Sequence, residues 1–95
     1  MNDIRKKWLT SLTDEEKMKL TYRDFIASEV EEILDELLAP KHVKEEARLF
    51  YFECLTIQGV AEKEQIDIKT AKSHRKKLTY AMRKTLCKMF PYEAS

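Results

Sequence analysis

The sequence predicts an all-α fold of four to five helices, and three observations support this prediction. The chain of 95 residues contains one glycine, Gly59, and two prolines. Tight β-turns and phosphate-binding loops need several residues at positive φ, which glycine adopts most readily, whereas helices need none. Apolar residues recur at spacings of three and four, as they do along one face of a helix. Polar residues that cap helices stand at the ends of these periodic stretches.

Residues 1–40 are expected to form an acidic amphipathic segment. Asn2 is expected to cap a short first turn, and Thr13 and Glu16 have the spacing of a capping box. A longer helix is predicted over residues 14–38, with or without a break, ending before Pro40. Its apolar stripe comprises Met18, Tyr22, Phe25, Ile26, Val30, Ile33, Leu34, Leu37 and Leu38. Its other face carries Glu29, Glu31, Glu32, Asp35 and Glu36.

Residues 41–95 are predicted to contain three further helices and to form the second domain. The first is expected over about Val43–Glu53. Thr56 is a candidate cap for a short helix over Ile57–Glu64, and Asp67 for a long helix from Ile68 towards Phe90. The segment between these two helices is a turn of three residues. The helix, turn and basic helix together have the layout of a C-terminal helix-turn-helix.

The last predicted helix has one apolar and one basic side. With Ala71 set at 0° and about 100° per residue, Leu78 and Met82 fall within about 20° of it and are expected to face inwards. Between Ile68 and Phe90 there are eight Lys and Arg residues and no acid. The net charge of +1 therefore conceals a strongly basic segment that can attract a polyanion.

A helix-turn-helix places the outer face of its second helix in the major groove of DNA, near the N-terminus of that helix. The residues expected to contact bases are Lys69, Lys72, Ser73 and Lys76. The residues expected to contact phosphates are Thr70, His74, Arg75, Lys77, Arg83 and Lys84. The N-terminus of the helix is expected to add to phosphate binding.

Two segments carry a resemblance to a known family. Residues 49–61 resemble the start of the helix-turn-helix in region four of bacterial sigma factors. Residues 66–75, with Thr70-Ala71-Lys72-Ser73-His74-Arg75, resemble the recognition helix shared by sigma region four and LuxR-type regulators. The resemblance covers Ala47 to Leu86, and it implies a small transcription regulator of the kind found in phages and mobile elements. It implies that Lys69, Thr70, Lys72 and Ser73 lie at the DNA and that Val60, Ala61, Ile66 and Ala71 lie in the core.

Three positions depart from the pattern of that family. Glu64 stands where the family has a buried leucine, and Cys54 where it has the glycine that ends the preceding helix. Gln65 stands at the turn glycine, so a positive φ is expected there, at a cost of about 1 kcal/mol for a residue with a Cβ.

The predicted function is sequence-specific binding of double-stranded DNA by a cytoplasmic transcription regulator. The alternative is a protein-interaction module that mimics sigma region four and binds RNA polymerase or a regulator without reading DNA. No catalytic residue, cofactor, metal or membrane contact is predicted. Four residues could in principle bind zinc (His42, Cys54, His74 and Cys87), but their spacing matches no zinc motif.

A partner is expected because one recognition helix contacts only about four base pairs. A homodimer and RNA polymerase are the candidates. The apolar stripe over 25–38 either closes the core or forms such an interface. The C-terminal tail, with Met82, Leu86, Met89 and Phe90, is the other candidate surface and the favoured one for a dimer.

Overall fold

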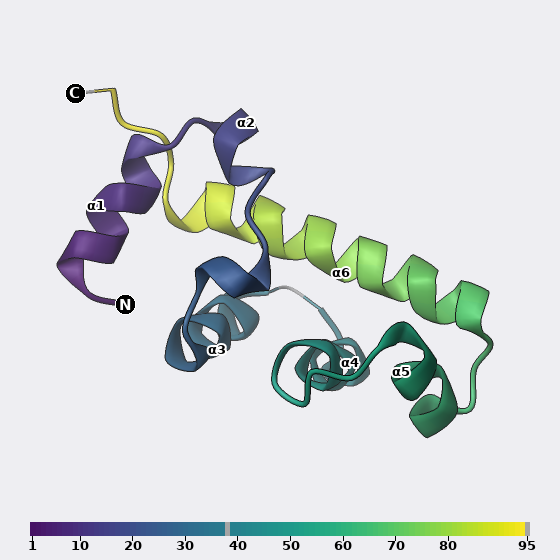
Figure 1. The fold of residues 1–95 in the computed structure, drawn as a ribbon. Helices are drawn as coiled ribbons and strands as arrows, with labels where there is room; N and C mark the ends of the chain where they lie inside the picture. Colours follow the sequence, from purple (N-terminus) through teal and green to yellow (C-terminus); the bar gives the residue numbers. More distant parts are fainter. Residues whose placement is uncertain (38, 95) are drawn as a thin grey trace. The chain divides into compact units, whose positions relative to one another are not determined.

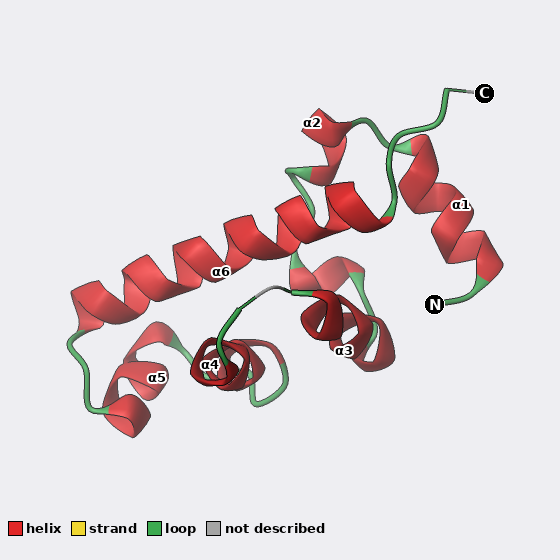
Figure 2. Cartoon of the chain, turned by 180° about the vertical axis from the view of Figure 1, so that it is seen from behind, coloured by secondary structure: helices red, strands yellow, loops and turns green. Residues whose placement is uncertain are grey.

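The computed structural model describes residues 1–37 and 39–94, and within these ranges the chain is all-α, as predicted. It contains six α-helices, one 3-10 helix and no strand among the described residues (Figures 1 and 2). The elements in chain order are α1 (Asp3–Ser11), α2 (Asp14–Lys17), η1 (Tyr22–Asp24), α3 (Ala27–Glu36), α4 (Lys41–Tyr51), α5 (Ile57–Glu64) and α6 (Ile68–Met89).

The chain groups into two compact units. The first comprises Met1–Leu37 together with Tyr80–Ser95, and the second comprises Leu38–Thr79. The predicted division at residue 40 lies near the first boundary, but the predicted C-terminal domain reached residue 95. The difference arises because the end of the chain bonds to the N-terminal segment. Arg83 donates to the carbonyl of Leu20 over 2.8 Å, and the amide of Glu93 donates to the carbonyl of Thr10 over 2.9 Å.

The helix predicted over residues 14–38, with or without a break, is broken twice in the structure. The predicted capping box of Thr13 and Glu16 is present, but it begins a helix of only four residues, α2. A second capping box, in which Asp24 accepts from the amide of Thr21 over 2.8 Å, begins η1. The side chain of Glu29 accepts from the amide of Ile26 and begins α3. Leu38, the last residue of the predicted helix, lies outside the described residues.

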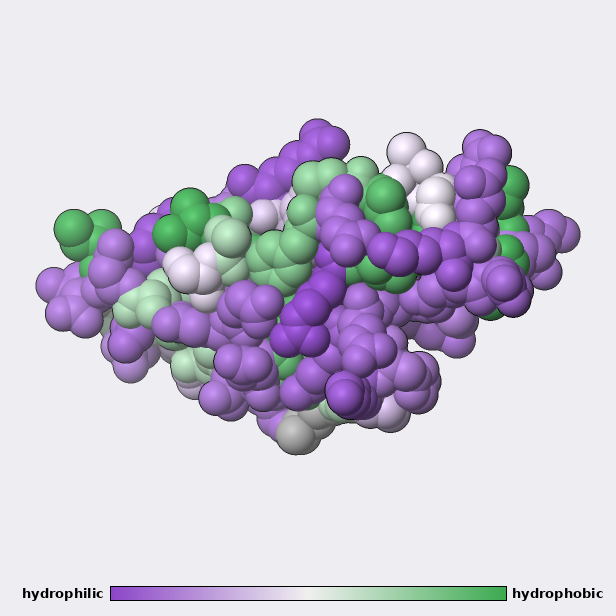
Figure 3. Space-filling model, turned by 90° about the horizontal axis from the view of Figure 1, so that it is seen from below, coloured by the Kyte–Doolittle hydropathy of each residue, from purple (hydrophilic) through white to green (hydrophobic). Residues whose placement is uncertain are grey.

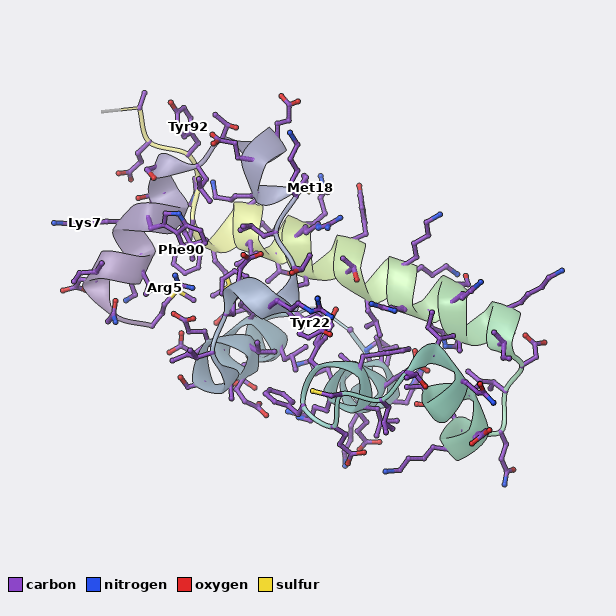
Figure 4. All side chains as sticks on the ribbon, in the orientation of Figure 1. Arg5, Lys7, Met18, Tyr22, Phe90 and Tyr92 are labelled. Carbon is purple, nitrogen blue, oxygen red and sulfur yellow. The ribbon has the colours of Figure 1, made fainter. Side chains whose placement is uncertain are left out.

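Arg5 joins α1 to η1 and α3 in the first unit (Figure 4). Its Nε donates to Glu29 over 2.9 Å, and one of its terminal nitrogens donates to the same carboxylate and to the carbonyl of Asp24. The guanidinium also lies 4.5 Å from the centre of the Trp8 ring. Glu29 is 3% exposed, and its hydrogen bonds with Arg5 hold the pKa of its carboxyl below the ordinary value.

Both surfaces expected to be available for a partner are largely buried within the chain itself. The stripe residues Phe25, Val30, Ile33, Leu34 and Leu37 are each at most 9% exposed. The C-terminal tail, which was the favoured surface for a dimer, is also largely buried: Met82, Leu86 and Phe90 are 1%, 0% and 8% exposed. The stripe therefore closes the core, which was one of its two interpretations. A homodimer stays a prediction, but it would need another surface.

The second unit contains α4, α5 and the first three turns of α6. Its buried apolar residues are Ala47, Phe50, Tyr51, Val60, Ala61, Ala71 and Leu78. The predicted bounds of the Ile57–Glu64 helix are confirmed, and the Thr56 hydroxyl caps it by accepting from the Gly59 amide over 3.0 Å. Gln65 has a φ of 57°, as expected at the turn, and Cys54 has a φ of 52°. These two residues therefore adopt the left-handed conformation without being glycine.

Figure 3 shows that hydrophilic residues cover most of the face seen in that view, with hydrophobic residues visible between them. The large apolar residues with the greatest exposure are Ile4, Ile26, Ile68, Tyr80 and Tyr92. Isolated apolar side chains on a surface are ordinary, so they become informative only through their neighbours.

Replacing Arg5 with methionine is expected to lower the free energy of unfolding by about 2 kcal/mol, because the Glu29 carboxylate is then buried without its cation. The loss is smaller than for a wholly buried pair because the Arg5 side chain is 31% exposed. Urea denaturation measures it. Lys7→Met is the matched control, since Lys7 is exposed and extends away from α1 in Figure 4. Equal stability of the two variants would contradict this role for Arg5.

Candidate nucleic-acid interface

The start of α6 is fixed by Asp67, as the sequence predicts. The carboxylate of Asp67 accepts from the amide of Thr70 over 2.8 Å, and this bond lowers the pKa of Asp67. The ionised cap occupies this amide and adds a negative charge at the helix N-terminus. A phosphate is therefore less favoured at this end of α6 than a free helix N-terminus would make it. We therefore expect the basic side chains of α6, and not its N-terminal amides, to contact phosphates.

The four residues expected to contact bases are all exposed along the first turns of α6: Lys69, Lys72, Ser73 and Lys76. The side chains on the opposite face, Ala71 and Leu78, are 0% and 4% exposed, so the predicted inner and outer sides of the helix are observed. In the described chain no acidic group lies within ion-pair distance of the three lysines. Their charges are left available to a ligand.

The residues expected to contact phosphates divide into two groups. Arg75, Lys77 and Lys84 are exposed. The other three have polar partners inside the protein. The amide of Thr70 is bonded to Asp67, His74 is bonded to Glu46, and the Nε of Arg83 donates to the carbonyl of Leu20. Arg83 and Lys84 also lie in the part of α6 that groups with the first unit.

A polar cluster around the buried Glu46 includes one residue from each helix of the second unit. Glu46 of α4 is 6% exposed, and its Oε2 lies 2.8 Å from Nδ1 of His74 on α6. The side chain of Glu64, on α5, lies near enough to the carboxyl group of Glu46 for the two to interact electrostatically. Burial, together with the neighbouring carboxyl group of Glu46, raises the pKa of Glu64 to about 7. Two neighbouring carboxylates repel each other, so the neutral form of Glu64 is favoured beside Glu46.

Sequence reasoning missed Glu46, although a local signal was present. Glu46 precedes Phe50 by four residues and so lies on the buried face of α4. An acid on an apolar helix face needs a partner in the core. Glu64 stands where the family that the sequence resembles has a buried leucine. In the structure its carboxyl group lies near that of Glu46.

Changing Glu64 to glutamine is expected to flatten the pH dependence of stability between pH 5 and pH 8. The folded chain retains a proton on Glu64 that the unfolded chain releases near pH 4.5. The contribution to the free energy of unfolding is therefore complete below about pH 4.5 and is lost as pH rises through about 7, by about 3 kcal/mol. Glutamine cannot lose that proton. Urea denaturation at several pH values measures the difference.

Glu62→Gln is the control, because Glu62 is an exposed acid on the same helix. It should keep the pH dependence of the unmodified protein. If both variants keep that dependence, Glu64 does not hold a proton that is linked to folding.

Neither a metal site nor a membrane span is found in the part of the chain that the structure describes. No group of three or more His, Cys, Asp or Glu side chains there could hold a metal ion, and no helix there is long and apolar enough to cross a membrane.

Comparisons with protein-family models, with curated proteins and with solved structures found no match to this chain.

Proposed function

We propose that the chain is a transcription regulator that binds double-stranded DNA sequence-specifically through the outer face of the first turns of α6. The observation that carries this proposal is the row of exposed lysines without acidic partners at Lys69, Lys72 and Lys76. Lysine contacts guanine N7 and O6 in the major groove, and the exposed Ser73 beside them can donate to or accept from a base edge. Arg75 and Lys77 flank this row and are suited to phosphates.

The kinds of side chain that α6 exposes favour binding to duplex DNA over binding to a membrane. A basic helix that binds a lipid surface needs an exposed apolar face to enter the bilayer interface. The apolar face of α6 is used within the protein, since Ala71, Leu78, Met82 and Leu86 are at most 4% exposed. What α6 leaves exposed on its first turns is mainly cationic and hydrogen-bonding, which is the chemistry of nucleic-acid contact.

The second candidate function is a protein-interaction module that binds RNA polymerase or a regulator without reading DNA. Its support is the same cationic surface, which suits an acidic protein as well as a phosphate backbone. The two functions differ in whether the chain binds naked duplex DNA.

Selection of bound sequences from a random duplex pool, with no polymerase present, distinguishes the two functions. Enrichment of one motif supports DNA reading, and a pool that stays random contradicts it.

Removing the two flanking cations is expected to weaken the salt dependence of binding to a random duplex. Each lost phosphate contact lowers the slope of log K against log salt by about 0.9. The double variant Arg75→Gln/Lys77→Gln should therefore lose about two units of slope. Fluorescence anisotropy over a series of salt concentrations measures it. Lys6→Gln/Lys7→Gln removes the same charge from exposed positions on α1 and should leave the slope unchanged. If both double variants have equal slopes, Arg75 and Lys77 do not contact DNA phosphates and the proposed binding surface is contradicted.

Changing Lys72 to alanine is expected to reduce affinity for the selected sequence by about 1–3 kcal/mol and to relax the preference at one base pair. Lys72 lies in the middle of the lysine row, so it is the residue best placed to read a base. Repeating the selection with the variant measures the change in preference. Lys84→Ala, an exposed lysine near the other end of α6, should keep the original motif. If the affinity of the variant falls equally for all sequences, Lys72 contacts a phosphate and not a base.

A further inference from the structure

Ile68, the first residue of α6, has an exposed side chain beside the lysine row. It is 50% exposed, although isoleucine is among the residues most often buried. The Asp67 cap fixes the start of the helix and so fixes where this side chain projects. Exposure of one isoleucine carries no meaning by itself, and its neighbours supply two further observations.

The first observation is the row to which Ile68 belongs. Residues four apart on a helix form a continuous ridge, and Ile68, Lys72 and Lys76 are such a set. All three are exposed. An apolar side chain therefore heads the ridge on which the proposed base-reading lysines stand.

The second observation is an open groove between α5 and the start of α6. Its surface is mainly apolar, with Ile66 and Ile68 among its lining residues, and Lys69 lies at its edge. The groove is also lined by Glu62 and Asp67. These two acids repel phosphate, so the groove is suited to the edge of a base and not to the DNA backbone.

The C5-methyl group of thymine is the apolar group that base pairs present in the major groove. We infer that Ile68 contacts the C5-methyl group of a thymine next to the base read by Lys72, and so helps to determine sequence specificity. Four residues of helix span about 6 Å, so the thymine lies within about two base pairs of that base. The inference rests on the proposed DNA binding and adds a residue and a base group to it.

The test uses the duplex obtained by selection, with each thymine replaced in turn by uracil, which lacks the methyl group. In the unmodified protein, one replacement near the Lys72 position should weaken binding about fourfold, the effect of losing one buried methyl group. Ile68→Ala should weaken binding to the thymine duplex and should be insensitive to that replacement. Ile4→Ala removes the same atoms from an isoleucine that is 80% exposed on α1 and should behave as the unmodified protein does.

The outcomes separate the inference from the proposed function. If the protein binds no duplex, the proposed function fails and this inference fails with it. If it binds a selected duplex but no uracil replacement changes its affinity, or the change is the same in Ile68→Ala, only the inference is contradicted. Urea denaturation of Ile68→Ala checks that the fold is intact, which is expected because the side chain is half exposed.

Discussion

The buried carboxyl group of Glu46 is the contact on which the arrangement of the second unit depends. It bonds to His74 of α6, it lies near the carboxyl group of Glu64 on α5, and it stands on α4 beside the apolar residues of the core. The Glu46–His74 contact and the burial of Ala71 and Leu78 together agree with one rotation of α6 about its own axis. With His74 turned towards Glu46, Ala71 and Leu78 face inwards, and the lysine row at Lys72 and Lys76 faces out. The proposed DNA-binding surface follows from that rotation.

The features of the fold that depend only on residues close together in the sequence could be predicted. Thr56 and Asp67 cap α5 and α6 because each side chain reaches an amide three residues along the chain. The positive φ of Gln65 was foreseeable from the glycine that a resembling turn has there. The broken segment over residues 14–36 was missed although its signals are also local. Apolar spacing continues across both breaks, and the helix starts at Thr21 and Ile26 were not recognised from the sequence.

The long-range contacts of the candidate site could not be predicted in the same way. Lys69, Lys72 and Lys76 were placed outside by helix periodicity alone, and the structure agrees. His74 and Arg83 satisfied the same sequence pattern, yet their partners lie 28 and 63 residues away. Nothing in the spacing of a single helix indicates such a partner. The sequence therefore overestimates the number of basic groups that α6 can offer to a ligand, because His74 and Arg83 have partners within the protein.

The central claim is that duplex DNA binds the outer face of the first turns of α6. The most direct measurement is a nuclear magnetic resonance titration of the isotope-labelled protein with the selected duplex, which reports the response of each backbone amide. We expect the largest shifts on residues 68–77 and on residues 65–67 of the turn before α6, with small shifts over α1 and α3. Largest shifts on α1 or α3, or no shifts at any ratio of DNA to protein, would contradict it.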